Sequence, residues 1–146
     1  MNLLPAILAF LLLPHGRAYV RECRRMPQGC ENYAAELAHA IDGASAAHGV
    51  DPRLLVALAY HESSLTGRSN AVSRGVFGWH RRSAMWSRCS TADMECQADL
   101  TAAHLRDLLF RCGSWAGALS AYQSGQCKSD SGVRYARRVL GIGGAI

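Results

Sequence analysis

The sequence lacks the patterns that mark a membrane protein, a repeat protein or a metalloenzyme. Its longest apolar run, 3–13, is too short to span a bilayer about 30 Å thick. The sequence contains no C-x-x-C, no pair of histidines at zinc-like spacing and no G-x-S-x-G element of serine hydrolases. No internal repeat or low-complexity linker divides its 146 residues. We therefore expect one domain, with no metal and no other cofactor.

Lysine is nearly absent, and the positive charge is carried by arginine. Lys128 is the single lysine, and fifteen arginines bring the net charge to +5. An excess this small does not indicate a nucleic-acid partner. It is compatible with any polyanionic surface, including a bacterial wall polymer.

The first eighteen residues have the form of a secretory signal peptide. An apolar run over 3–13 is followed by small residues at Gly16 and Ala18, which fit a cleavage after Ala18. The segment before the run is poor in positive charge, so an uncleaved anchor stays open as the alternative. We expect residues 19–146 to form the mature, secreted or periplasmic domain, with no stable membrane span after cleavage.

All six cysteines lie within this mature part. An even number of cysteines behind a signal peptide predicts three disulfides in an oxidising compartment. Sequential pairing is our preferred choice among fifteen possible pairings. The middle bridge requires a helix that begins near Asp93, because a helix running from Ser90 would separate the two Cα atoms by roughly 9 Å. The candidate half-cystines are Cys23, Cys30, Cys89, Cys96, Cys112 and Cys127.

Helical periodicity dominates the mature chain, and the fold class is predicted to be mainly α. The segment 54–60 is apolar on every side, which is typical of a helix at the centre of a core. Residues 65–89 are rich in glycine, serine and arginine and predict a long structured loop with one short helical or hairpin piece. Further helices are expected from Glu31 to Gly49, from Asp51 to an end within 61–64, from the Ser90–Asp93 region to Gly113, from Ser114 to Gly125 and from Gly132 to Leu140.

Glu62 is the outstanding candidate for chemistry. It closes the apolar helix, where desolvation and the negative end of the helix dipole both raise the pKa of a carboxyl group. The next acidic residue is Asp93, so the intervening loop contains no second carboxylate. Asp93, Glu95 and Asp99 are better explained by the first turn of a helix. A single protonated acid next to a loop is suited to general acid catalysis near neutral pH.

Two other roles for Glu62 follow from its neighbours in the sequence, a structural ion pair and a metal ligand. The carboxylate is equally compatible with a partly exposed helix end that pairs with Arg68 or Arg74. The H-E-x-x-H pattern of zinc proteases fails here, because Leu65 stands where the second histidine is required.

Four ordered blocks resemble the soluble-lytic-transglycosylase family, the lysozyme-like domain of glycoside hydrolase family 23. The first block pairs Glu62-Ser63 with the run 70–78, which is similar to the family's E-S, N-A-x-S and G-L-M-Q elements. The others are 96–105, similar to N-I-x-x-G-x-x-Y-L; 118–125, similar to A-x-x-A-Y-N-x-G; and 135–140, similar to Y-V-x-x-V-L. The resemblance implies a lysozyme-like α domain of several short helices around a buried central helix, with a long cleft loop after it.

By this resemblance, Glu62 is the single catalytic acid. The substrate contacts expected are Ser73, Trp79, Arg81, Tyr122, Gln123 and Tyr135, and Tyr135 is also the tyrosine that faces the acid. Arg81 stands where the family has glutamine, Gln123 where it has asparagine, and His104 where it has tyrosine. Trp79 and Trp86 suit either a sugar-stacking or a core position.

The activity implied is cleavage of the β-1,4 bond between N-acetylmuramic acid and N-acetylglucosamine without water, which leaves a 1,6-anhydro end. The expected partner is the peptidoglycan strand. By analogy with family members, a secretion, conjugation or pilus system is a further candidate partner. Two alternatives stay open: a hydrolytic muramidase that cleaves the same bond, and a catalytically weak, basic wall-binding module.

Overall fold

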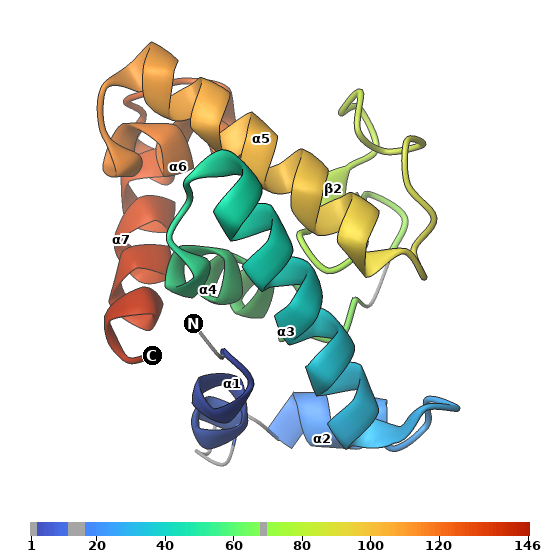
Figure 1. Ribbon diagram of the computed structural model, residues 1–146. Helices are drawn as coiled ribbons and strands as arrows, with labels where there is room; N and C mark the ends of the chain where they lie inside the picture. The colour runs from blue at the N-terminus through green and yellow to red at the C-terminus, as the bar shows by residue number, and fades with distance from the viewer. Residues whose placement is uncertain (1–2, 12–16, 68–69) are drawn as a thin grey trace.

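The computed structural model describes residues 3–11, 17–67 and 70–146 (Figure 1). Within these ranges the chain is mainly helical, as the sequence predicted, with one small two-stranded sheet. The elements are α1 (Leu4–Leu11), α2 (Arg17–Cys23), α3 (Gly29–His48), α4 (Pro52–Ser63), β1 (Ser73–Arg74), β2 (Trp79–His80), α5 (Met94–Cys112), α6 (Trp115–Ser124) and α7 (Asp130–Gly144).

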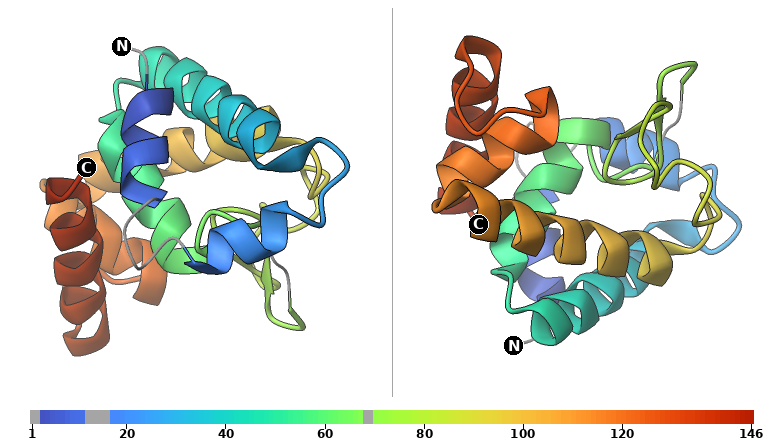
Figure 2. Two further views of the ribbon diagram at one scale, coloured as in Figure 1. Left: turned by 90° about the horizontal axis from the view of Figure 1, so that it is seen from below. Right: turned by 90° about the horizontal axis from the view of Figure 1, so that it is seen from above.

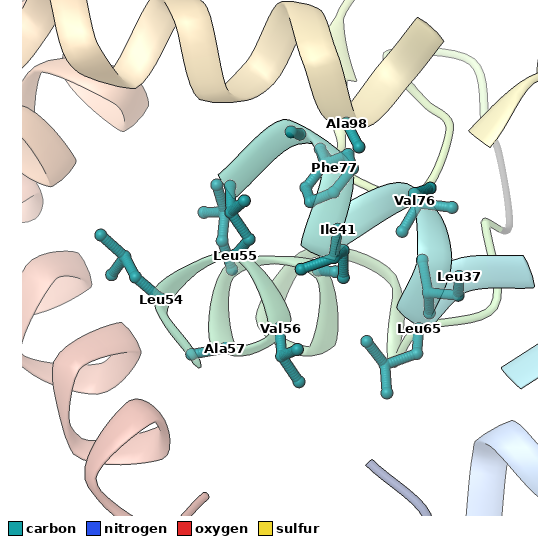
Figure 3. Packing of buried hydrophobic residues seen from close by; sticks show 14 of the residues in the cluster. Leu37, Ile41, Leu54, Leu55, Val56, Ala57, Leu65, Val76, Phe77 and Ala98 are labelled. Carbon is teal, nitrogen blue, oxygen red and sulfur yellow. The ribbon is translucent and has the colours of Figure 1, made fainter. Parts of the chain in front are cut away.

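Helix α4 lies at the centre of the molecule, as its apolar sequence predicted. Asp51 caps it by accepting the backbone N–H of Arg53, and Pro52 occupies the first turn. All six residues from 54 to 59 are buried. Figure 3 shows how α4 packs against α3 and the loop residue Phe77. The helix ends at Ser63, and its C-cap, Ser64, adopts a left-handed conformation with φ 53°.

The other long helices surround α4. Helices α3 and α5 pack side by side, and α6 connects α5 to α7, which packs against α4 (Figure 2). The expected caps are present at Gly49 and Gly113, both with positive φ, and at Ser114, which accepts the Gly117 N–H. These helices are therefore bounded largely where the sequence predicted.

Helix α7 is longer than predicted. We expected it to end before Gly141, but it runs on to Gly144. The extension packs on α4, since a Cβ at Gly143 would come within 3.7 Å of the Ala57 Cβ. Glycine inside a helix costs about 1 kcal/mol, which tertiary packing can offset.

The segment after α4 contains a short hairpin, in agreement with the predicted loop with one hairpin piece. β1 and β2 are antiparallel, with Ser73 opposite His80 and Arg74 opposite Trp79. The Asn70 side chain accepts the N–H groups of Val72 and Ser73 and shapes the turn into β1. This hairpin lies beside the end of α4 that carries Glu62.

Three disulfides are present, and the predicted sequential pairing is confirmed: Cys23–Cys30, Cys89–Cys96 and Cys112–Cys127. The middle bridge has a Cα–Cα distance of 5.8 Å. It forms because α5 begins at Met94, with Asp93 as its cap. The helix therefore begins late enough for Cys89 and Cys96 to form a disulfide, as their spacing in the sequence requires.

The N-terminal helix α1 packs against α3. Leu3 and Ile7 are fully buried there, and the Leu3 N–H lies 3.4 Å from the Asp42 carboxylate. Gly16, one of the small residues of the expected cleavage site, lies outside the described residues. No helix in the described part of the chain is both long enough and apolar enough to cross a membrane. Cleavage after Ala18 stays a prediction.

Candidate active site

Glu62 lies in the last turn of α4 and is half-buried. The backbone of Gly78 passes directly against its side chain. A Cβ at Gly78 would overlap the Glu62 Oε2 atom and lie 2.8 Å from the Glu62 Cβ. Gly78 also has φ +63°, a conformation that favours glycine. Two independent features therefore favour glycine at this position: its positive φ and its close contact with the Glu62 side chain.

Glu62 opens onto a cavity of about 240 Å³, called here the Glu62 cavity. Its wall combines residues from α4, the hairpin loop, α5 and α6. Glu62 is its only carboxyl group among the described lining residues. These residues are Glu62, Ser73, Gly78, Trp79, His80, Ser83, Met85, His104, Tyr122 and Gln123.

Tyr135 reaches the same carboxylate from α7. Its hydroxyl donates a hydrogen bond to Glu62 Oε1, and its ring is buried. The His61 ring stands edge-on to Tyr135, with 4.9 Å between the ring centroids. Burial and the charge of Glu62 raise the pKa of Tyr135 above its ordinary range, so the phenol keeps its proton and stays a donor.

Burial raises the pKa of Glu62, and the hydrogen bond from Tyr135 opposes that rise. The sequence predicted this direction. No arginine in the described part of the chain forms an ion pair with Glu62. Arg74 instead donates to the Trp86 carbonyl at 2.9 Å and lies over the Trp86 ring. Arg68, the other arginine considered as a partner, lies outside the described residues.

Two aromatic residues fix the far wall of the cavity. The Tyr122 hydroxyl donates to the Phe77 carbonyl at 2.7 Å, which ties α6 to the loop. The Trp79 indole N–H donates to the Thr101 hydroxyl at 3.0 Å, and only 3 % of Trp79 is exposed. Trp79 is thus mainly a core residue that also contributes to the wall.

Most of the residues expected to contact substrate are brought together. Ser73, Trp79, Tyr122 and Gln123 line the cavity with Glu62. Two expected contacts do not line it: Arg81 is exposed, and Tyr135 is bonded to Glu62 from behind the lining residues. Trp86 is half-buried beneath Arg74 and lies outside the lining.

Five lining residues were not predicted to be in the site: Gly78, His80, Ser83, Met85 and His104. His104 is half-buried and tilts against the Tyr122 ring, with centroids 5.9 Å apart. Burial lowers its pKa, which favours the neutral ring. Their positions in the sequence could have placed both histidines in the site, because His80 lies within the loop motif and His104 lies on the buried side of α5.

Two side chains hold the loop in place, and sequence reasoning missed both. The Ser63 hydroxyl donates to the Val76 carbonyl at 2.9 Å and accepts the Gly67 N–H at 3.2 Å. Gln97 is 2 % exposed; its Oε1 accepts the Val76 N–H at 3.0 Å. The Gln97 amide donates to three carbonyls, those of residues 90, 91 and 93. The available signal was a glutamine within an otherwise apolar helix face.

In the described ranges, no three His, Cys, Asp or Glu side chains lie close enough together to hold a metal ion. Comparison of the chain with protein-family models, with curated proteins and with solved structures found no match. The function must therefore be argued from the site and the sequence motifs.

Proposed function

We propose that this protein is a peptidoglycan lytic transglycosylase with a lysozyme-like α domain, and that Glu62 is its single general acid and base. The observation that carries the proposal is the Glu62 carboxyl group: partly buried, with a raised pKa, and bonded to Tyr135 at the wall of an open cavity. Such a carboxyl group stays protonated closer to neutral pH than an exposed one.

The first step is proton donation. Protonated Glu62 gives its proton to the glycosidic oxygen, and the bond from that oxygen to C1 of N-acetylmuramic acid breaks. Positive charge develops at C1. The 2-acetamido oxygen of the same sugar stabilises this charge, a role that a second carboxylate fills in most glycosidases. The described cavity wall offers no second carboxylate, and this arrangement needs none.

The second step returns the proton. The Glu62 carboxylate takes the proton from the C6 hydroxyl of the same sugar, and the C6 oxygen bonds to C1 as the acetamido group leaves it. Glu62 is protonated again, and no water is consumed. Tyr135 donates to Oε1 of the carboxylate, which orients it and stabilises its charge between the two steps.

The remaining wall of the cavity suits a sugar. It places Ser73, Gln123 and His104 as polar groups beside the aromatic ring of Tyr122. Sugar hydroxyl and acetamido groups require hydrogen-bond partners, while their C–H faces pack on aromatic rings.

We place the protein in a secreted or periplasmic location. Three disulfides are typical of an oxidising compartment. A local role in opening the wall for a secretion, conjugation or pilus system follows from the family resemblance alone. Fractionation of cells that express the full chain tests the location, and mass spectrometry of the recovered protein reads its N-terminus. A chain that starts at Tyr19 supports cleavage of the signal peptide, whereas a chain that starts at Met1 supports the anchor.

The test of the activity is the Glu62→Gln variant on purified peptidoglycan. Glutamine keeps the size and polarity of the side chain but cannot donate the proton, so turbidity clearance falls by at least about 10²-fold. Clearance at the wild-type rate by a folded variant would contradict the assignment. No clearance by the wild type would favour the wall-binding module, and reducing ends without anhydro sugar would favour the muramidase.

A further inference from the structure

The turn at residues 80–83 forms one rim of the Glu62 cavity. The Ser83 N–H donates to the His80 carbonyl at 2.8 Å and closes the turn. His80 and Ser83 both line the cavity. Ser73, the cross-strand partner of His80, lines it as well. Directly opposite residues of an antiparallel pair share one face of the sheet, so these side chains belong to one surface.

Within this turn the side chains of His80 and Ser83 each accept a backbone N–H, which leaves each of them a hydrogen to donate. His80 Nδ1 accepts the Arg82 N–H at 3.2 Å, so the proton of the neutral ring is on Nε2. Ser83 Oγ accepts the Met85 N–H at 3.1 Å. The Ser83 hydroxyl hydrogen has no acceptor among the described residues. Both side chains therefore have a proton available for a ligand.

The same turn carries two arginines, which lie outside the cavity lining. Arg81 and Arg82 are exposed, and neither forms an ion pair with any described carboxylate. Arg53, by contrast, is paired with Asp51 at 2.9 Å. No acidic residue occurs between Glu62 and Asp93 in the sequence. The rim is thus positive and offers donors, which suits an anionic acceptor.

We propose that the turn 80–83, with its two arginines, is a subsite for a carboxylate of the peptide attached to N-acetylmuramic acid. This inference rests on the proposed function and names which form of the substrate the protein prefers. A guanidinium group binds a carboxylate with two parallel hydrogen bonds, and His80 and Ser83 add single donors. The turn therefore selects glycan strands that still carry their peptides.

Binding to the inactive Glu62→Gln protein separates this subsite from catalysis. The probes are soluble peptide-bearing glycan fragments, the same fragments with their carboxyl groups converted to methylamides, and peptide-free fragments with a free lactyl carboxylate. Isothermal titration should show that the native fragments bind about fivefold more tightly than the methylamides. That preference should shrink as salt is added, because exposed charges are screened.

The decisive variant adds Arg81→Gln and Arg82→Gln to this protein and should abolish the preference for native fragments. The matched control is Arg24→Gln with Arg25→Gln, an adjacent exposed pair in the turn after α2 that removes the same charge outside the cavity wall. The control should keep the preference. Thermal melting of both double variants confirms that they are folded.

Equal affinity for native and methylamidated fragments, or no measurable binding of either, would overturn the subsite. Peptide-free fragments that bind as tightly as native ones, with the same dependence on Arg81 and Arg82, would reassign it to the lactyl carboxylate and overturn the role of the peptide. Cleavage by the wild type is scored separately. Charge-dependent binding without any cleavage would refute the proposed function, whereas cleavage without a preference would refute only the subsite.

Discussion

The Tyr135 hydroxyl donates a hydrogen bond to Glu62 Oε1 and so joins two helices whose contact residues lie 73 positions apart in the sequence. The phenol holds the carboxylate from α7, while Gly78 confines it from the loop. Burial raises the pKa of Glu62 and the phenol lowers it, so the proton affinity of the acid depends on both contacts.

Removing the phenol should move the pH dependence of activity. In Tyr135→Phe the pKa of Glu62 rises further, because the hydrogen bond that lowers it is lost. The alkaline limb of the pH–rate profile therefore moves to higher pH. The unfolding free energy falls by about 1–3 kcal/mol where Glu62 is ionised, since a partly buried carboxylate loses its donor.

The control for this prediction is Tyr122→Phe, which removes a phenol bonded to the Phe77 carbonyl instead of Glu62. It should cost about 1 kcal/mol of stability and leave the alkaline limb where it is. An unchanged limb in Tyr135→Phe would show that the phenol does not set the proton affinity of the acid.

Glu62 should make stability depend on pH. Its pKa in the folded protein is raised above the ordinary 4.5, so the folded state binds this proton more tightly than the unfolded state. The resulting stabilisation is complete below the ordinary pKa and is lost as pH rises through the folded pKa. The melting temperature of Glu62→Gln should therefore rise relative to that of the wild type as the pH is raised from acid to neutral.

Glu36→Gln is the matched control, since Glu36 is exposed and in no ion pair among the described residues. Its melting-temperature difference from the wild type should stay flat over the same range. If the melting-temperature difference between Glu62→Gln and the wild type does not change with pH, ionisation of Glu62 does not destabilise the folded protein, and this prediction is wrong.

Gly78→Ala should impair catalysis beyond its effect on the backbone. The new methyl group would overlap the Glu62 carboxylate, so the acid must move. Gly49→Ala is the control: its φ of +65° is similar, but a Cβ there meets nothing within 4 Å. Both variants should lose about 1 kcal/mol of stability from the positive φ, and only Gly78→Ala should lose activity.

The Cys112–Cys127 bridge should contribute most among the three disulfides, because it closes the longest loop, with a separation of 15 residues against 7 for the others. Replacing both cysteines by serine should lower the unfolding free energy by about 3 kcal/mol in the chain-entropy view. Denaturant titration measures this change. An equal or larger loss on removing Cys23–Cys30 would contradict the ranking.

Features governed by local sequence were predictable. The buried helix α4 follows from its continuous apolar run, and the Cys89–Cys96 bridge follows from the cap at Asp93. Glu62 could be identified as the candidate general acid because it lies at the end of that helix and no second acidic residue is near it in the sequence.

Features set by tertiary contact were not predictable. The extension of α7 beyond Gly141 depends on packing against Ala57, and the role of Gln97 depends on a loop that reaches it from 21 residues away. Arg81 lies just beyond β2, where its N–H donates to the Val72 carbonyl at 3.0 Å, and its side chain is exposed in the turn that follows.

The most direct test of the central claim is mass spectrometry of the muropeptides released from purified peptidoglycan. We expect the wild type, and not Glu62→Gln, to form 1,6-anhydro-N-acetylmuramic acid ends, which are lighter by one water molecule than hydrolysis products. Reducing N-acetylmuramic acid ends from the wild type, or anhydro ends at an undiminished rate from Glu62→Gln, would contradict it.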